Sequence, residues 1–290
     1  MGFERYRFKV GTFECMAVSD GNMTYTPPMF PPPATLLFIN APKDHLARKL
    51  REYNLQPEQW AEWISPYICL LVNTGKHRVL VDTGAGTLAP ITGKLIPNLK
   101  AGGVSPEDID RVILTHGHPD HIGGNLDSEG KPAFHNARFS MWKDEWDFWS
   151  SEQAEQRLPE HVRKRQIAFA RRNLPPIQDR LDLVDREKEI VPGVRAVAAP
   201  GHTPGHMALA ISSGGEQLLC ISDAWLHPIH LESTDWCAAV DLAPEQVTDT
   251  RRRLLGMAVA EGALVLAFHF PFPGLGHVVR KGEAWQWQPI

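Results

Sequence analysis

The sequence predicts an α/β (α+β) fold in which two sheets pack together and helices cover them from outside. Two sets of short apolar runs of strand length each end in helical patterns, which is typical of layered α/β architectures. The chain has 290 residues with 43% apolar content, enough for one large core. No linker or shift in composition divides it, so we expect a single domain over residues 1–290.

The amino-terminal half begins with an alternating pattern that indicates a hairpin around Gly11. The proline-rich stretch at residues 26–33 can form neither a helix nor an inner strand, because proline lacks the amide hydrogen. A helix capped by Asp44 follows this stretch. The elements expected here are strands over Phe3–Val10, Phe13–Val18, Tyr67–Val72, Arg78–Val81 and Arg111–Thr115, and a helix over Asp44–Tyr53.

The carboxy-terminal half opens with a charged, aromatic-rich segment that predicts a helical insert near residues 141–180. A second set of strands follows, with one long helix before the last of them. The elements expected here are helices over Ala137–Trp149, Gln153–Asn173 and Pro244–Glu261, and strands over Gly193–Ala199, Met207–Ile211, Gln217–Ser222, Ala263–Phe268, Gly276–Arg280 and Ala284–Trp287.

Charge and cysteine content narrow the function classes. The net charge of −4 gives no reason to expect nucleic acid as a partner. The basic runs at residues 163–165 and 251–253 lie in helical patterns and are interpreted as solvated helix faces. The four scattered cysteines are expected to be reduced thiols. We find no signal-peptide pattern and no apolar run long enough to span a bilayer, and therefore expect a cytoplasmic protein without membrane contact.

The densest chemical pattern is the run THGHPDH at residues 115–121, at the end of a predicted buried strand. Residues two apart in an extended segment project to the same side, so His116 and His118 can reach one ion. Asp120 and His121 begin the following turn and can face a second ion. Further candidates follow the ends of three later strands, where sheet proteins gather their sites. The candidate metal ligands are His116, His118, Asp120, His121, His202, Asp223 and His269.

These residue types favour a hydrolytic metal centre. A lone histidine after a strand is usually structural. His269 is a candidate metal ligand only because the cluster at residues 116–121 already indicates a metal site. Imidazoles and carboxylates without thiolate suit Zn, Mn, Fe or Co and do not choose among them. We expect two divalent metal ions, with zinc as the first expectation and Fe, Mn or Co as alternatives.

The motifs resemble those of the metallo-β-lactamase superfamily: H-x-H-x-D-H, the turn G-H-T-P-G-H, a later Asp and a final His. The resemblance implies a four-layer αβ/βα sandwich with a dinuclear site at one edge of the sheets. It further implies that Asp223 bridges the two ions and that Asp82 supports the metal loop. The remaining assignments implied are His116, His118 and His202 for one ion and Asp120, His121 and His269 for the other.

Two segments are similar to the methyl-parathion-hydrolase-like and lactonase branch of this superfamily, namely residues 268–277 and 251–255. Members of that branch hydrolyse lactones, aryl esters or organophosphate triesters, and by this resemblance a homodimer is expected. Acyl-homoserine lactonases often carry a tyrosine three residues after the bridging Asp, where this chain has Leu226. His227 or the metal is the expected substitute for that phenol.

The expected mechanism is attack of a hydroxide that bridges the two ions, with Asp120 moving the proton to the leaving group. The expected substrate is a small molecule with an acyl chain or aryl group. Tyr25, Met29 and Phe30 of the proline-rich region are predicted to form one pocket wall, and the tryptophans of the insert another. Those tryptophans have a competing interpretation as the core face of a helix: Trp142, Trp146 and Trp149.

Three alternatives share the superfamily resemblance. A glyoxalase-II-like thioester hydrolase is expected to carry a basic carboxyl terminus, which residues 281–290 do not provide. An RNA-processing nuclease would need a broad basic face. A mononuclear-iron sulfur dioxygenase uses fewer ligands than the seven found here. Counting the bound metal ions distinguishes the last of these from a hydrolase.

Overall fold

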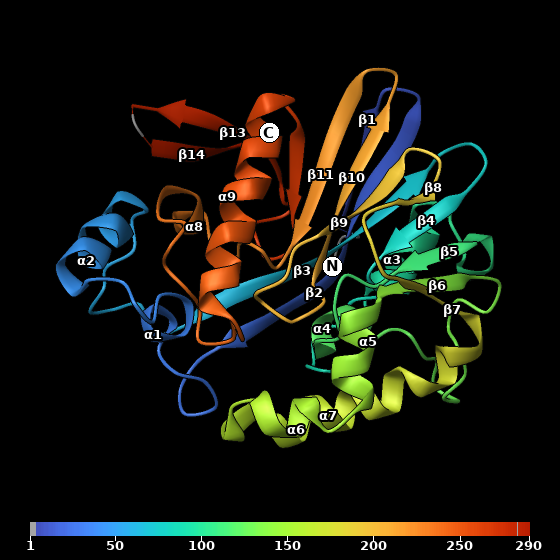
Figure 1. Cartoon of the computed structure of the whole chain (residues 1–290), viewed down its shortest axis with the longest axis horizontal. Coiled ribbons are helices and arrows are strands. Elements are labelled where there is room, and N and C mark those ends of the chain that lie inside the picture. The colour runs from blue at the N-terminus through green and yellow to red at the C-terminus, as the bar shows by residue number, and fades with distance from the viewer. Residues whose placement is uncertain (1–3, 283) are drawn as a thin grey trace.

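Two seven-stranded sheets form the centre of the computed structural model, which describes residues 4–282 and 284–290 (Figure 1). The first sheet has the strand order β1-β2-β3-β4-β5-β6-β7, and the second has the order β14-β13-β12-β11-β10-β9-β8. The strands are β1 Arg5–Val10, β2 Phe13–Tyr25, β3 Trp63–Asn73, β4 Arg78–Val81, β5 Arg111–Ile113, β6 Arg138–Trp142, β7 Leu181–Val184, β8 Glu189–Val191, β9 Val194–Ala198, β10 Met207–Ser213, β11 Glu216–Ser222, β12 Leu264–Ala267, β13 Leu275–Lys281 and β14 Ala284–Pro289.

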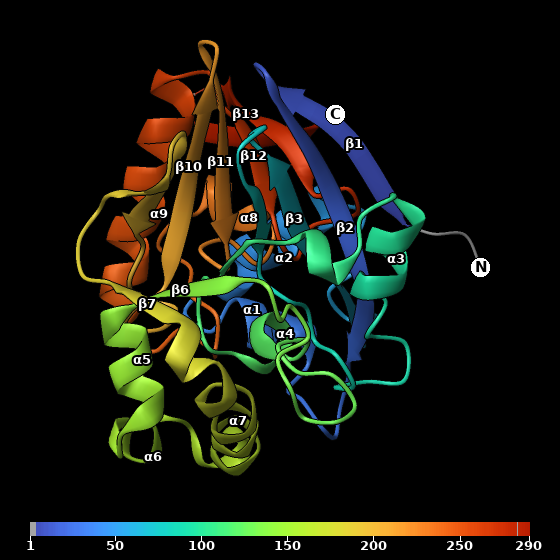
Figure 2. The same ribbon diagram turned by 90° about the vertical axis from the view of Figure 1, so that its right-hand side faces the viewer.

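Helices cover the outer faces of both sheets. Figure 2 shows α9 against the second sheet and α3 against the first, with the two sheets between them. The helices are α1 Pro33–Leu37, α2 Lys43–Glu52, α3 Leu95–Ala101, α4 Pro119–Ile122, α5 Lys143–Ser150, α6 Gln153–Arg157, α7 Glu160–Asn173, α8 Ile229–Glu232 and α9 Pro244–Ala260, with 3-10 turns at Pro106–Asp108 and Pro175–Arg180. The expected four-layer sandwich is confirmed.

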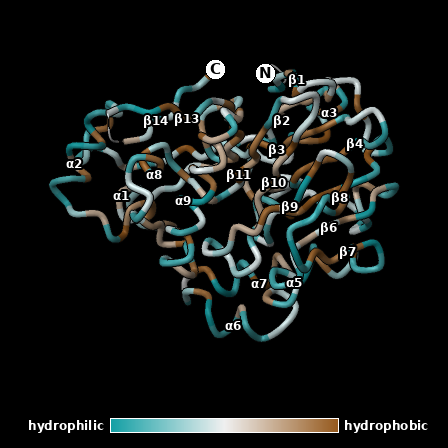
Figure 3. Tube along the Cα trace, turned by 45° about the horizontal axis from the view of Figure 1, so that its top comes forward, coloured by the Kyte–Doolittle hydropathy of each residue, from teal (hydrophilic) through white to brown (hydrophobic). Residues whose placement is uncertain are grey.

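Strand β3 shows why the sheets stack in this way. Ile68, Leu70 and Val72 lie in the core between the two sheets, whereas Cys69 and Leu71 point into the core beneath the outer helices. Successive side chains of a strand point to opposite faces, so a strand with apolar residues at every position must be covered on both. In Figure 3 the inner strands are accordingly brown, and the outer helices are mostly teal.

The expectation of a helix over Ala137–Trp149 is wrong in its first half. Arg138–Trp142 is strand β6, which pairs in parallel with β5, and helix α5 begins at Lys143. The apolar residues of β6 complete a buried sheet, and this tertiary pairing overrides the helical pattern. The helical insert therefore begins two residues later than the expected residue 141.

Two expectations for the amino-terminal half also need correction. Strand β2 continues to Tyr25 instead of ending at Val18, because it pairs with β3 along its whole length. Helix α2 begins at Lys43 with Pro42 at the cap position, so Asp44 lies in its first turn and does not cap it. The expected strand start at Phe3 lies outside the described residues.

Two further expectations concern the thiols and the membrane. All four cysteines are buried free thiols, as expected. Within the described part of the chain, no helix combines the length and the apolar character needed to cross a bilayer.

Candidate metal centre and cavity

The candidate ligands gather where strands of both sheets end. His116 and His118 follow β5, and the proline-initiated helix α4 then carries Asp120 and His121. His202 follows β9, Asp223 follows β11, and His269 follows β12. Strand ends thus place ligands that are far apart in the sequence at one edge of the sandwich.

The ligand atoms form two groups, and within each group they lie no more than 4.8 Å apart. In the first group, Nδ1 of His118 is 3.0 Å from Nε2 of His116 and 3.0 Å from Nε2 of His202. Asp223 completes the first group, and the second group consists of Asp120, His121 and His269.

Asp223 faces both groups. Its Oδ2 lies 3.3 Å from Nε2 of His202 in the first group and 3.0 Å from Nε2 of His269 in the second. Its Oδ1 is 3.1 Å from Nε2 of His121. A carboxylate in this position could contribute to both ligand groups.

The donor set fits two metal ions. Nε2 of His121 and Oδ1 of Asp223 are buried and lie 3.1 Å apart, but neither forms a hydrogen bond within the described residues, which costs about 1–3 kcal/mol for such an atom. A cation bound here would be a partner for both atoms. Burial lowers the pKa of His116 and of His118 well below the usual range, with neighbouring histidines adding to the effect, so these rings are neutral, as metal ligation requires.

Asp82 supports the loop that carries the histidine motif. Its Oδ2 is 2.8 Å from Nδ1 of His121, and its carboxylate accepts hydrogen bonds from the backbone and the hydroxyl of Thr115. Asp82 has a φ of 59°, and Ser222, next to Asp223, has a φ of 47°. Left-handed backbone is unfavourable for residues other than glycine, so strain is concentrated beside the ligands.

Two further supports were not anticipated from the sequence. Oγ of Ser65 lies 2.7 Å from Nδ1 of His269. Oδ1 of Asp241 lies 2.9 Å from Nδ1 of His202. Each contact occupies the ring nitrogen that faces away from the cluster and thereby orients the other nitrogen toward it.

Arg251 corrects the interpretation of residues 251–253 as a solvated face. Its side chain is fully buried and donates to the carbonyl oxygens of Ala224 and Trp236 and to Oδ2 of Asp241. Burial acts to raise the pKa of Asp241, but Arg251 and His202 outweigh it and lower that pKa to about 2. The carboxylate behind His202 is therefore ionised. A charged triplet in the sequence does not reveal which of its members turns inward.

Glu145 of α5 connects the two histidine motifs. Its Oε1 accepts hydrogen bonds from the Gly117 amide at 2.8 Å and from the indole of Trp149 at 2.6 Å. Its Oε2 accepts from the hydroxyl of Thr203 at 2.6 Å and from the Gly205 amide at 3.0 Å. Glu145 is fully buried and was not singled out in the sequence, because a single acidic residue in a charged helix carries no pattern.

The close approach of α5 also explains a glycine in each motif. A Cβ atom on Gly117 would lie 2.3 Å from Nε1 of Trp149. A Cβ atom on Gly205 would lie 2.1 Å from the backbone nitrogen of Glu145. Neither distance is sterically possible, so both glycines allow the insert to pack directly on the ligand loops.

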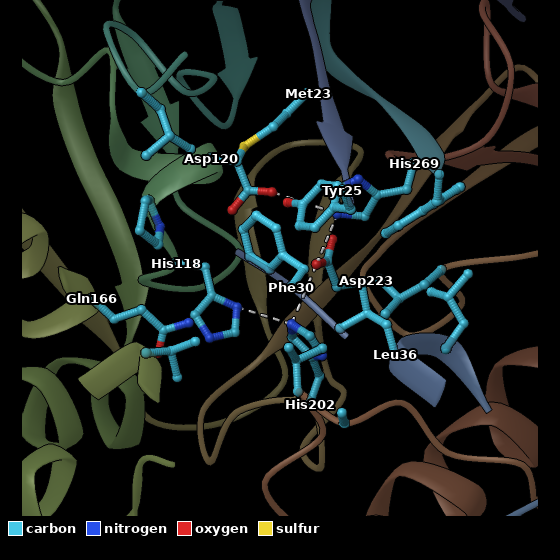
Figure 4. A pocket seen from close by; sticks show the side chains of 18 of the residues that line it. Met23, Tyr25, Phe30, Leu36, His118, Asp120, Gln166, His202, Asp223 and His269 are labelled. Atoms are coloured by element: carbon cyan, nitrogen blue, oxygen red, sulfur yellow. Dashed lines mark hydrogen bonds and ion pairs between the residues drawn. The ribbon is translucent and has the colours of Figure 1, made fainter. Parts of the chain in front are cut away.

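An open cavity lies over the ligand cluster (Figure 4). Its mouth and walls are mostly apolar, and Arg165 and Gln166 of α7 add polar groups. The residues that line it are Met23, Tyr25, Phe30, Leu36, Leu37, Trp63, Leu88, His118, Pro119, Asp120, Val162, Arg165, Gln166, His202, Asp223, Leu226, Ala239, Val240 and His269.

Of the expected wall residues before the insert, Tyr25 and Phe30 line this cavity and Met29 does not. Met29 is 67% exposed and points away from the core. Tyr25 belongs to the end of β2 and not to the proline-rich loop. The proline-rich segment gives no indication of which of its side chains turns inward.

The expected tryptophan wall is not found. Trp142 is buried between the two sheets, Trp146 packs against the core beneath the outer helices, and Trp149 binds Glu145. None of them lines the cavity, and helix α7 provides this wall through Val162, Arg165 and Gln166. The competing interpretation of the tryptophans as core residues agrees with this placement.

His227 also lies outside the set of residues that line the cavity. Its Nδ1 accepts the backbone N–H of Ile229, and its ring packs edge-on against Phe38 and Tyr53. Its position therefore does not support the expectation that His227 substitutes for the tyrosine that acyl-homoserine lactonases often carry where this chain has Leu226. The side chain of His161 lies outside the described residues.

Comparisons with known proteins agree with this arrangement. A family model described as the metallo-beta-lactamase superfamily matches residues 66–269. An N-acyl homoserine lactonase from a Bacillus species is 29% identical over 182 residues, which cover 55% of this chain and 64% of that relative. The chain thus spans just under two thirds of the length of this curated relative.

Two solved structures match almost the whole chain. AidC, described as a dizinc quorum-quenching lactonase in complex with a product, superposes with a TM-score of 0.86 at 27% identity, covering 99% of this chain and 98% of its own. The hydrolase AbOPH superposes with a TM-score of 0.87 at 27% identity, covering 100% and 98%. The family and the fold expected from the motifs are confirmed.

Proposed function

Because the chain belongs to the metallo-beta-lactamase superfamily, we propose that it is a dinuclear metal-dependent hydrolase that opens lactone rings, with N-acyl homoserine lactones as its substrates. The observation that carries this proposal is the position of two complete ligand groups at the floor of one largely apolar cavity. A charged substrate would find few partners on such walls, whereas an acyl chain would be desolvated by them.

Two zinc ions are the proposed cofactors, which agrees with the dizinc description of the similar AidC structure. Bound ions of this kind supply Lewis acidity, which lowers the pKa of water and stabilises an oxyanion. Asp223 is the proposed bridging ligand because its carboxylate lies close to histidines of both groups. The proposed ligands of one ion are His116, His118 and His202, and those of the other are Asp120, His121 and His269.

Asp120 is the proposed proton carrier. It lines the cavity, and its Oδ2 lies 3.7 Å from Nε2 of His269. In ring opening, the oxygen of water bonds to the carbonyl carbon and the bond from that carbon to the ring oxygen breaks. Asp120 takes the proton of the nucleophile and returns it to the departing alkoxide, which becomes the hydroxyl of the product.

The polar edge of the cavity favours a substrate with an amide in its acyl arm. Oε1 of Gln166 is buried without a hydrogen-bond partner, and Gln166 lines the cavity beside His118 (Figure 4). In the proposed complex the side-chain amide of Gln166 contacts the substrate amide, and the neighbouring Arg165 is available to the amide carbonyl. A simple aryl ester or alkyl lactone offers no amide to either group.

A hydrolysis panel on the metal-loaded enzyme tests this proposal. It contains N-acyl homoserine lactones, alkyl γ-lactones, p-nitrophenyl esters, a phosphotriester and an acyl thioester. We expect the highest kcat/KM on the acyl-homoserine lactones. Faster turnover of the thioester would instead support the thioesterase alternative, which has a curated relative in an atrochrysone carboxyl ACP thioesterase from Passalora fulva, 30% identical over 146 residues.

A further inference from the structure

Two tyrosines from neighbouring strands form a pair beside the ligand cluster. The hydroxyl of Tyr25, at the end of β2, lies 2.9 Å from the hydroxyl of Tyr67 in β3. Tyr67 is fully buried, and its ring packs edge-on against His269 at a centroid distance of 5.7 Å. Tyr25 lines the cavity. The pair therefore connects the interior of the protein to the space above the ligands.

The surroundings of Tyr67 determine which hydroxyl donates. Within residues 4–282 and 284–290, the hydroxyl of Tyr25 is the one hydrogen-bond partner of the Tyr67 hydroxyl. A buried O–H without an acceptor costs about 1–3 kcal/mol, so Tyr67 donates its proton to the oxygen of Tyr25. The proton of Tyr25 is then free for another acceptor.

The hydroxyl hydrogen of Tyr25 is available for a hydrogen bond to a substrate in the cavity. Figure 4 shows the Tyr25 hydroxyl directed toward the carboxylate of Asp120. The ordinary pKa of a phenol is about 10, so Tyr25 carries its proton near neutral pH. Phe30 and Trp63 hold its ring, with centroids 4.5 and 5.0 Å away. Leu226, which also lines the cavity, has no proton to donate.

We infer that Tyr25 donates a hydrogen bond to the carbonyl oxygen of the substrate, and that Tyr67 positions Tyr25 for this contact. The inference rests on the proposed lactone hydrolysis. No covalent bond to the protein forms: the phenol keeps its proton and stabilises the negative charge that develops on the oxygen during attack. Tyr25 is thus a catalytic residue supplied by a strand of the first sheet.

Removal of single hydroxyl groups tests this role. We expect Tyr25→Phe to lower kcat on an acyl-homoserine lactone by about 100-fold with little change in KM, because the contact strengthens in the transition state. Tyr67→Phe should lower kcat by about 10-fold, since it only releases Tyr25 from its position. Tyr53→Phe, which removes a phenol bound to Glu232 away from the cavity, is the matched control and should keep full activity.

Relocation of the phenol separates a chemical role from a structural one. The double variant Tyr25→Phe/Leu226→Tyr places a hydroxyl at another position in the lining of the same cavity and should regain at least part of the lost kcat. The metal content and the melting temperature of every variant are measured alongside. Unchanged kcat in Tyr25→Phe with full metal content would overturn the inference.

A binding measurement provides a readout that does not depend on turnover. A phosphonate analogue of the tetrahedral intermediate resists hydrolysis and carries the negative oxygen that the phenol is expected to stabilise, and its Kd should weaken by about 10-fold in Tyr25→Phe. Equal affinity for both proteins would contradict the carbonyl contact. A loss of kcat that grows with the pKa of the leaving group would also contradict it, because the phenol would then serve the leaving oxygen.

Different results would contradict the proposed lactonase function and the inference on Tyr25. If the unsubstituted enzyme turns over lactones and Tyr25→Phe does so equally well, the inference on Tyr25 is wrong and the proposed function stands. If the unsubstituted, metal-loaded enzyme turns over no lactone, both are wrong.

Discussion

The ligand cluster and the cavity wall above it differ in how firmly they are held. All seven ligand residues are at most 8% exposed, and the side chains of His121, His202 and His269 have a second partner behind them. In the wall, Phe30 and Arg165 come from a loop and a surface helix, and Oε1 of Gln166 has no partner. The two sheets thus hold the chemistry in place, whereas peripheral segments provide the substrate contacts.

This difference indicates where activity and specificity can be changed separately. Side chains on rigid strand ends are preorganised, so a change there should affect turnover or metal binding. Loosely held wall residues should affect KM and substrate preference with little effect on the metal centre. Substitutions of both kinds test whether activity and specificity can be changed separately.

Asp120→Ala should have the largest effect. Loss of a group that both binds metal and moves the proton should lower kcat on any substrate by about 1,000-fold or more. Asp179→Ala, at an exposed position of the 3-10 turn before β7, is the matched control and should leave kcat unchanged. The measurement is kcat of both variants by steady-state kinetics. Unchanged kcat in Asp120→Ala would exclude the proposed role of Asp120.

Glu145→Gln should act next most strongly, through metal affinity. All four groups around this carboxylate donate hydrogen bonds, so an amide NH₂ placed there faces donors and loosens both histidine loops. We expect metal affinity to fall by about 10–100-fold, which a competition titration with a chelating dye measures. Asp144→Asn, exposed on the same helix, should bind metal normally. Equal affinity in both variants would show that Glu145 is not a support of the site.

The prominence of Glu145 shows where the sequence stops being informative. The ligands could be predicted because metal binding requires several donor side chains at a short, recognisable spacing. Strand β4 could be predicted because it is a short apolar run that ends at a turn. Glu145, Asp241 and Ser65 could not be predicted, because each is a common residue whose role arises from a contact across 28 to 204 positions in the chain. Their partners are known only once the sheets are assembled.

The tryptophans could not be placed from the sequence for the same reason, because their surroundings depend on how the strands pair. The spacing of Trp142, Trp146 and Trp149 fits one helical face, but Trp142 ends a strand that the neighbouring strand β5 holds in place. Sequence periodicity reports which side chains are apolar, and it does not report which of two apolar environments they enter. Cavity walls built from several peripheral segments are for this reason harder to predict than metal motifs.

Phe30 and Met29 form a matched pair within the wall. Phe30→Ala removes apolar surface that lines the cavity and should raise KM for a long-chain acyl-homoserine lactone by about 10-fold. Met29→Ala removes a side chain that is 67% exposed and should leave KM unchanged. Identical KM values in the two variants would remove Phe30 from the substrate site.

Gln166→Leu should have the smallest effect, confined to substrate preference. Loss of the amide partner should reduce the preference for acyl-homoserine lactones over alkyl γ-lactones by about 5-fold, the equivalent of about 1 kcal/mol. Gln153→Leu, on the exposed surface of α6, is the control. An unchanged ratio of kcat/KM values would mean that Gln166 does not contact the acyl arm.

The central claim is that both ligand groups must be filled to form one hydrolytic centre. Its most direct test is a titration of metal-free protein with zinc, in which bound metal and acyl-homoserine lactone turnover are measured at each step. The account predicts that activity rises mainly as the second equivalent of zinc per chain binds. Full activity at a single equivalent, or oxygen-dependent activity with one bound iron, would contradict it.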